Sequence, residues 1–445
     1  MKEFRSPFVP VRRSSGGVEE SHAQYRFSRM KRKYTQTELT MDGWDRVPAA
    51  QRWEFLDPHP RVHKDTTLNI PRHASKSDVF RALVPEHLIK ALQPSFDSTK
   101  DAYVMWGFTA FAIANVPPAM HPSPSPLKEQ PLLIELRDLV DRESNGASEA
   151  PGFHRFKRLQ ELFMITTSFA RRELSSHLAS VVVTWGETVA LDEKMRTWRG
   201  ESPHYKTVLS KPESRGHWTT QIVAMLQDVE LPFCFGLYPF DSTVNLGETT
   251  EMSEIWDWAL GLIPALGGPC IVADSYYLTR AQLGILLTRG ARFTCSITPK
   301  SFKEYHDLLK EDVKEVGSTA VAYKPSENLM VTMHWDRDSK VGKKMVITNS
   351  LKLSRSSTPE VGLQTAYWLY RDRFSYCDRF NRCLHNYKYP FRRSTWEKNF
   401  DSLFVSTLLI NAYHSWIYCN PTANEGTTLL EFTHQLGLEL MRKST

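Results

Sequence analysis

The sequence has few cysteines, no long apolar run and no strong excess of charge of one sign. Its six cysteines form no Cys-x-x-Cys pair, so we expect no disulfide framework, and a reducing compartment is favoured. No stretch approaches the roughly 20 continuous apolar residues of a membrane helix. The charged N-terminus is not followed by the apolar segment of a secretory signal, so neither a signal nor a membrane segment is expected. The net charge of +6 permits a nucleic-acid partner without requiring one.

The 445 residues are enough for two or three domains. Residues 1–45 are polar and locally basic, and we expect them to be a disordered tail. Contact with DNA phosphates or nuclear import is one interpretation of this basic tail, and a solvated tail without a partner is the other. Residues 46–183 are expected to be mainly helical, with an amphipathic helix at 153–164.

The remainder of the chain alternates between short apolar runs and amphipathic segments. Strands are expected at 189–191, 221–226, 231–238, 270–273 and 293–297, and in a β-rich region at 300–360 as three strands at 319–323, 329–335 and 344–348. Helices are expected at 250–263, at 279–290, within 361–385, at 398–417, and from the capping box of Thr428 and Glu431 onward. This alternation indicates a mixed α/β protein.

Two aspartates stand at the ends of two of the apolar runs. Asp192 follows the run at 189–191, and Asp274 follows the run at 270–273. A carboxylate at the edge of a buried strand is costly unless it is paired or binds a cation, so the two together suggest a metal site at the rim of a sheet. Such a site suits phosphoryl transfer on nucleic acid. The plainer alternatives are an ion pair of Asp192 with Lys194 or Arg196, and helix capping by Asp274.

Several blocks around these residues follow one another in a recognisable order. Trp185–Met195 is similar to a Pro-Gly-Glu-x-x-x-Ile-Asp-Glu-x-Met block, and Ala273–Thr279 to an Asp-Asn-Phe-Phe-Thr-Ser block. The smaller blocks are Trp198-Arg199-Gly200, Lys211-Pro212 with Gly216, Tyr370–Asp378, and the apolar stretch Phe404–Tyr413. In their order and spacing, over roughly residues 150–417, these blocks resemble piggyBac-type DNA transposases and the proteins derived from them.

The resemblance implies an RNase H-like core of the DDE/D transposase type, split between residues 184–299 and 361–417. The β-rich insertion at 300–360 would lie between the two parts, with a helical region for dimerisation or DNA binding at 46–183 and a C-terminal helix at 418–445. It also implies a homodimer that acts in the nucleus on double-stranded DNA by nicking the ends, forming hairpins and joining at TTAA. Carried over position by position, the catalytic and metal-binding residues are Asp192, Asp274 and Asp378, which would hold two Mg²⁺ or Mn²⁺ ions.

Other residues have more than one interpretation. Asp378 has Arg373 and Arg379 nearby, so a surface ion pair is the simpler explanation, and Asp372 and Asp401 compete with it for the third position. Glu193 should point to the opposite face of its strand from Asp192, which makes it a poor ligand candidate. Basic and aromatic residues expected to contact DNA are Arg199, Lys388, Arg392, Arg393 and Trp396. A solvated loop anchored by Trp396 is the alternative for the last four.

Three departures from the family pattern keep a second function open. Asn381 stands where the family often has a fourth aspartate, Ser375-Tyr376 replaces a Gly-Gly pair, and the sequence to Thr445 has no cysteine-rich zinc-binding tail. Activity as an enzyme is therefore the favoured but open expectation. The alternative is a domesticated, catalytically impaired protein that binds DNA or associates with chromatin. A cellular RNase H-like nuclease is a more distant possibility.

Overall fold

The structure of the protein is a computed structural model that describes most of the chain from residue 43 onward. The described residues are 43–47, 53–55, 66–92, 102–103, 106–107, 109–110, 113–114, 166–198, 200–208, 214–243, 250–264, 268–336, 342–353, 366–387, 395–422 and 426–443. The tail expected at residues 1–45 falls almost wholly outside these ranges, and the helix expected at 153–164 falls outside them entirely. The boundaries of the expected domains stay predictions.

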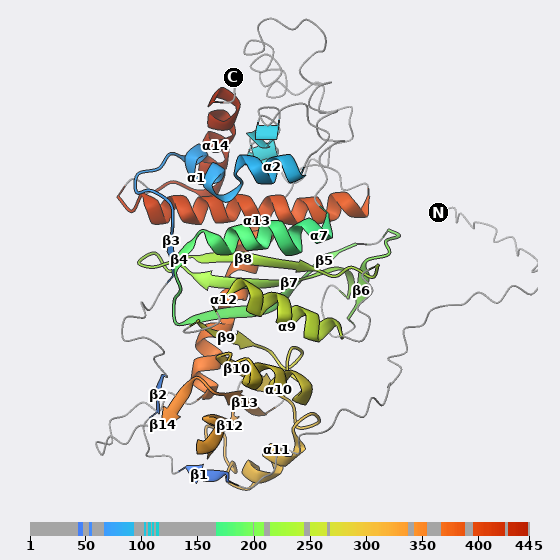
Figure 1. Cartoon of the computed structure of the whole chain (residues 1–445), viewed down its shortest axis with the longest axis vertical. Helices are drawn as coiled ribbons and strands as arrows, with labels where there is room; N and C mark the ends of the chain where they lie inside the picture. The colour runs from blue at the N-terminus through green and yellow to red at the C-terminus, as the bar shows by residue number, and fades with distance from the viewer. Residues whose placement is uncertain are drawn as a thin grey trace, which may run out of the picture. The chain divides into compact units, whose positions relative to one another are not determined.

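A mixed sheet of ten strands forms the centre of the described part (Figure 1). In spatial order its strands are β1 (Asp45–Val47), β11 (Thr319–Lys324), β12 (Leu329–Trp335), β13 (Lys343–Thr348), β10 (Phe293–Ile297), β9 (Cys270–Ala273), β5 (Thr188–Thr197), β7 (Arg215–Met225) and β6 (Tyr205–Thr207), with β8 (Pro232–Pro239) also paired to β7. Strands β9 and β10 run parallel to β5, whereas β7 runs antiparallel to both β5 and β8. The expectation of a mixed α/β protein is confirmed.

The three strands expected within 300–360 are present and extend the central sheet. Strand β13 pairs antiparallel with β10, so that Thr294 faces Thr348, and β12 and β11 follow on its other side. The outermost strand, β1, comes from far earlier in the chain and pairs Asp45 with Tyr323. The region therefore continues the hydrogen-bond ladder that contains β5 and β9.

Helices cover this sheet (Figure 1). They are α1 (Lys76–Leu83), α2 (Glu86–Leu92), α7 (Thr167–Phe169), the π-helix η1 (Ala170–Leu174), α8 (Ser175–Ser180), α9 (Glu251–Leu262), α10 (Arg280–Thr288), α11 (Lys303–Leu309), the 3₁₀ turn η2 (Pro325–Glu327), α12 (Ala366–Asn386), α13 (Trp396–Cys419) and α14 (Leu429–Lys443). Two small sheets pair β14 (Leu351–Leu353) with β2 (Trp53–Phe55) and β3 (Thr67–Leu68) with β4 (Val182–Thr184).

The helix ends follow the local sequence signals closely. Helix α9 ends at Leu262, two residues before Pro264, which cannot continue a helix. The capping box before α14 is complete, because Glu431 N–H donates to the Thr428 hydroxyl and Thr428 N–H donates to the Glu431 carboxylate. At α10 the helix begins after Thr279 as expected, but the threonine hydroxyl donates to the Gln282 side chain in place of accepting from a backbone N–H.

Helix α13 is buried on almost every side, which explains its weak amphipathic pattern. It packs against β8 on one side and against α1 and α14 on the other (Figure 1). Its buried Asn411 donates to the carbonyl of Cys234 at 2.6 Å and accepts from the N–H of the same residue at 3.0 Å. Cys234 borders an irregularity in β8, where the pairing with β7 shifts register, and Asn411 supplies the partners for its backbone there.

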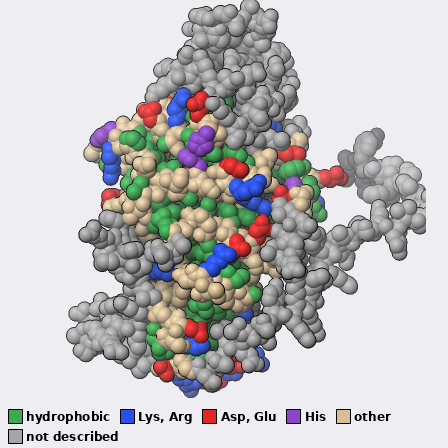
Figure 2. Space-filling view, in the orientation of Figure 1, with side chains coloured by type: hydrophobic (Ala, Val, Ile, Leu, Met, Phe, Trp, Pro, Cys, Tyr) green, Lys and Arg blue, Asp and Glu red, His purple; other side chains and the backbone are tan. Residues whose placement is uncertain are grey.

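The surface shown in Figure 2 carries mixed charge. On that face Lys and Arg side chains alternate with Asp and Glu over the described elements, and no band of a single sign covers them. The acidic cluster described below is therefore a local feature of the sheet edge.

Candidate metal centre

The register of β5 and β9 places Asp192 beside Asp274. These strands run parallel, and their last paired residues are Leu191 and Ala273. The next residue of each strand is an aspartate, so both carboxylates stand at the point where β9 ends while β5 continues. One oxygen of each lies within 4.8 Å of the other. Because backbone hydrogen bonds fix the register, the two acids are held together before any ligand binds.

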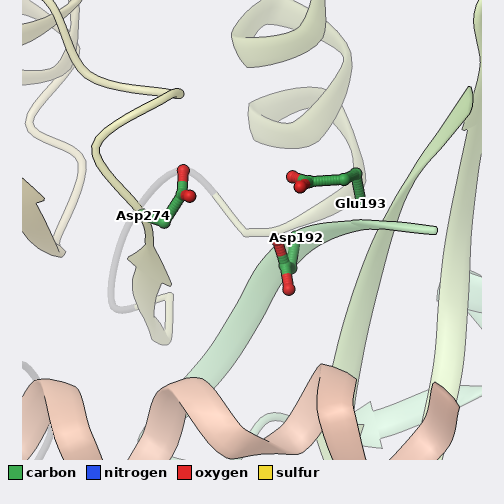
Figure 3. Close-up of side chains that lie close together, drawn as sticks. All are labelled: Asp192, Glu193 and Asp274. Atoms are coloured by element: carbon green, nitrogen blue, oxygen red, sulfur yellow. The ribbon is translucent and has the colours of Figure 1, made fainter. Parts of the chain in front are cut away.

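Glu193 completes a cluster of three carboxylates, contrary to the expectation that it would lie away from the site. Its oxygen is also within 4.8 Å of oxygens of Asp192 and Asp274. Figure 3 shows that Asp192 and Glu193 leave β5 on opposite sides, as strand alternation requires, with Glu193 directed toward Asp274. The expectation failed because β9 ends beside this position, which leaves the longer glutamate side chain free to reach the site.

Hydrogen bonds from the turn after β9 hold these carboxylates in place. The N–H of Tyr276 donates to Asp274 Oδ1 at 2.7 Å, and the Tyr277 hydroxyl donates to Glu193 Oε2 at 3.1 Å. Burial raises the pKa of the Tyr277 phenol, so the hydroxyl stays protonated and donates. The indole N–H of Trp256 donates to the carbonyl of Tyr277 at 2.7 Å and so fixes the backbone that follows β9.

The electrostatics of the cluster favour a proton or a cation. Burial, the charge of Glu193, a hydrogen bond shared with Glu193 and the charge of Asp274 together raise the pKa of Asp192 well above its ordinary value. Asp192 is 8% exposed and Glu193 is 7% exposed, so water provides little screening. A divalent cation would remove the repulsion that keeps Asp192 protonated.

A buried amide beside Asp192 has one polar atom without a partner in the described part of the chain. Gln221 faces Asp192 across the β5–β7 pair and donates from Nε2 to Asn381 Oδ1 at 2.8 Å. Its Oε1 is buried and, among the described residues, meets no hydrogen-bond donor. Such an oxygen can accept a hydrogen bond from a water molecule that is bound to a hard cation. Carboxylates and carbonyl oxygens are the ligands that Mg²⁺ prefers. The residues present therefore fit a divalent metal.

The comparisons with known proteins concern the family and the fold of the chain. Residues 172–413 match the family model described as Transposase IS4, which covers more than half of the chain. The chain belongs to this transposase family. No curated protein matches the sequence. A solved structure similar to this one is the cryo-EM structure of a piggyBac transposase synaptic complex with hairpin DNA, at 13% identity and a TM-score of 0.61, with 86% of this chain and 84% of that chain covered.

Membership of the transposase family confirms the broader part of the sequence prediction. The structural likeness to piggyBac transposase, at this identity, shows a shared fold. The matched range 172–413 contains all three expected aspartates and the strands that carry the first two. Among the described helices, none is long and apolar enough to cross a membrane.

Asp378, the third acid expected for the transposase family, lies outside the carboxylate cluster. It is exposed on α12, which crosses β5. Two α12 residues close to Asp378 do contact the sheet: Cys377 donates from its thiol to the Ala190 carbonyl at 3.4 Å, and Asn381 accepts from Gln221 at 2.8 Å. The competing Asp401 is buried in α13 beside Lys398, also outside the cluster. The role expected for Asp378 stays a prediction.

Most of the residues expected to contact DNA fall outside the described part of the chain. They are Arg199, Lys388, Arg392 and Arg393. Trp396, which begins α13, is described and packs inward: its ring centroid lies 4.6 Å from that of His204 and 6.1 Å from that of Phe400. It therefore anchors the start of α13, and contact of Trp396 with DNA stays a prediction.

Three residues of the site were not singled out by the sequence, namely Gln221, Tyr276 and Tyr277, and Glu193 was considered but set aside as a ligand. The two tyrosines follow Asp274 closely in the chain, so this proximity was the available signal. Gln221 reaches the site through the pairing of β5 with β7, which brings together positions 29 residues apart in a register that the sequence does not show.

Proposed function

We propose that this protein is a piggyBac-like DNA transposase that cuts and joins DNA by metal-dependent phosphoryl transfer at the cluster of Asp192, Glu193 and Asp274. The observation that carries the proposal is the adjacency of Asp192 and Asp274 at the end of two paired parallel strands. The arrangement of antiparallel β5, β7 and β8 with parallel β9 and β10 supports an RNase H-like core. Double-stranded DNA is the proposed substrate, with joining at TTAA, and the proposed state is a nuclear homodimer.

The chemistry requires a divalent metal, Mg²⁺ or Mn²⁺, and we propose two ions. Bound there, the ions would supply an activated water and stabilise the leaving oxygen of the phosphodiester. Asp192 and Asp274 would hold them, together with a third carboxylate from Asp378 or Glu193. The protein's own contribution is orientation, because the register of β5 and β9 and the hydrogen bonds from the Tyr276 N–H and the Tyr277 hydroxyl fix the carboxylates before DNA arrives.

The third carboxylate has two candidates. Glu193 already lies in the cluster, whereas Asp378 holds the position that the family resemblance assigns and is exposed one residue from Cys377, which contacts β5. Asp378 could join the site from the side of β5 on which Asp192 emerges. We propose Asp378 as the family ligand, with Glu193 as an additional acid that is specific to the arrangement seen here.

A second function is favoured by one observation. The position of the expected fourth aspartate is Asn381, and its oxygen is engaged by Gln221. A neutral amide pair at this place reduces the charge available to a second metal. A domesticated protein that binds DNA without cutting it would accommodate this change.

The deciding experiment is a cleavage and strand-transfer assay with the full chain in Mg²⁺ and in Mn²⁺. The substrate is duplex DNA that carries the gene's own flanking sequence with TTAA at the junction. Metal-dependent hairpins or joined products are expected from the wild type and none from Asp192→Asn. The matched control is Asp257→Asn, which changes an exposed aspartate of α9 that pairs with Arg289.

The same assay separates the candidates for the third acid. If Asp378→Asn abolishes cleavage and Glu193→Gln lowers it only partly, Asp378 is the family ligand. The reverse result assigns that role to Glu193. DNA binding without cleavage by the wild type under every metal condition would favour the domesticated protein.

A further inference from the structure

An exposed aromatic ring stands directly beside the carboxylate cluster. Large hydrophobic side chains are mostly buried in the described part of the chain, and the exposed ones are Val183, Tyr205, Tyr276, Val316, Trp368 and Leu430. Tyr276 is 44% exposed and lies two residues after Asp274. It is the member of this set that belongs to the turn holding the site, so its exposure calls for a functional explanation.

The ring of Tyr276 is held in position from behind. Its centroid lies 5.3 Å from that of Trp218, with the planes tilted by 49°, and 5.2 Å from that of Tyr277, in an edge-on contact at 87°. Trp218 is 3% exposed and has the Lys206 ammonium 5.3 Å from its own ring centroid. That ammonium is fixed by Glu251 at 2.6 Å. The exposed ring therefore rests on a packed support.

The same turn couples the ring to the acids. The hydrogen bond from the Tyr276 N–H to Asp274 Oδ1 ties the backbone of Tyr276 to a carboxylate of the cluster. Any group that rests on the ring is thus held at a nearly fixed place relative to Asp274. A flat apolar surface of this kind, beside a site for a phosphodiester, matches the face of a nucleobase.

Resting on the proposed function, we propose that Tyr276 is a positioning residue that stacks against an unpaired base of the DNA strand whose phosphodiester lies at the carboxylate cluster. Stacking on one face would hold the strand in place after its base leaves the duplex, which orients the adjacent phosphate toward Asp192 and Asp274. Stacking of this kind tolerates any base, because each base offers a flat face. It therefore adds affinity without adding sequence preference.

The test is DNA binding by the full chain in Ca²⁺, followed by the fluorescence of 2-aminopurine. The probe is a duplex with the TTAA junction and one unpaired 2-aminopurine beside it. The wild type and Tyr276→Phe should quench this fluorescence on binding. Tyr276→Ala should lose the quench and bind the probe about five- to a hundredfold more weakly, from the usual contribution of one stacked base. Moving the 2-aminopurine five base pairs into the duplex should abolish the quench in every variant.

The matched control is Tyr205→Ala, since Tyr205 of β6 has a similar exposure of 40% but packs against Arg215 of β7. It should bind and quench like the wild type. Melting temperatures of all variants are compared, and Tyr276→Phe keeps the packing against Trp218. An unchanged affinity and quench in Tyr276→Ala, or no quench in the wild type, overturns the proposal.

The test of stacking by Tyr276 can fail or succeed independently of the test of DNA cleavage. If the wild type cleaves DNA, Asp192→Asn does not, and Tyr276→Ala binds the probe like the wild type, the stacking proposal is refuted and the proposed transposase activity is not. Quenching that depends on Tyr276 in a protein that never cleaves DNA supports the stacking and refutes the transposase activity.

Discussion

The buried acids should make the metal-free protein less stable as the pH rises, and Asp192→Asn should remove this effect. With oxygens no more than 4.8 Å apart, two carboxylate charges repel by about 3.5 kcal/mol at an effective dielectric constant of about 20. Ionising Asp192 in the folded protein costs energy of this size, whereas in the unfolded chain it costs almost none. Asparagine has nearly the same shape and carries no charge, so the substitution isolates the repulsion.

The direction of the pH effect follows from the raised pKa of Asp192. Above the ordinary pKa of an aspartate the unfolded chain has lost this proton, while the folded protein still holds it. The unfolded state then binds fewer protons, so the free energy of unfolding falls as the pH rises, until the pH passes the pKa of the folded state. The stabilisation is thus present at low pH and absent at high pH. Metal binding should reverse the loss, because the ionised cluster is the form that binds.

The assay is thermal unfolding in EDTA from pH 5 to 8.5, expressed as the difference between wild type and Asp192→Asn. The difference is needed because other buried groups also titrate. At about 2.1 cal/mol/K for each of the 445 residues, the entropy of unfolding is about 0.9 kcal/mol/K. A repulsion of about 3.5 kcal/mol therefore makes Asp192→Asn melt about 4 °C higher than the wild type at pH 8. Adding Mn²⁺ at about 100 times its Kd should raise the wild type by about 3 °C and leave the variant nearly unchanged.

Asp257→Asn is the control, because Asp257 is exposed, pairs with Arg289 and lies outside the cluster. It should keep the pH dependence of the wild type. Equal melting temperatures of wild type and Asp192→Asn across the whole pH range in EDTA would refute the reasoning about charge repulsion.

Four further predictions concern single residues. Asp274→Ala should abolish Mg²⁺-dependent cleavage without lowering the melting temperature in EDTA, because it also removes a charge that repels Asp192. Residual cleavage in this variant would exclude Asp274 as a ligand. Tyr277→Phe removes the donor to Glu193 and should weaken Mn²⁺ binding about 10- to 100-fold by calorimetry, with Tyr205→Phe unchanged. Asn411→Ala leaves the backbone of Cys234 without its two partners and should cost about 2–5 kcal/mol in urea unfolding; a loss below 1 kcal/mol would contradict this. Burial lowers the pKa of His217 to about 4, so between pH 4 and 6.5 the unfolded chain binds more protons than the folded protein and the free energy of unfolding rises with pH. His217→Gln should flatten this slope in urea melts recorded over that pH range.

Local patterns predicted the elements that carry the site. The apolar runs before Asp192 and Asp274 are strands β5 and β9, and the helices α9 and α10 begin and end close to the residues expected from Thr279 and Pro264. The meeting of Asp192 and Asp274 could also be predicted, because carboxyl ends of parallel strands lie at one edge of a sheet. For these features the information lies within a few residues of each position.

The remainder depends on pairings between distant segments. Strand alternation correctly places Glu193 on the side of β5 away from Asp192, yet only the early end of β9 allows it to reach Asp274. The position of Asp378 was inferred from block spacing alone. Successive residues of a helix differ by about 100° in direction, so the inward placement of Cys377 leaves Asp378 at the flank of α12.

The pairing of β1 with β11 has a consequence for how the chain is made. Asp45 pairs with Tyr323, and α1 packs against α13. Strand β1 and helix α1 are therefore synthesised long before the segments that they pack against. At a synthesis rate of roughly 5–20 residues per second, some 270 residues take about 15–55 seconds to follow β1 from the ribosome. During that time the apolar face of α1 and the open edge of the growing sheet have no partner. These surfaces are therefore exposed to solvent while the chain is being made, and the fold is completed only when α13 has emerged.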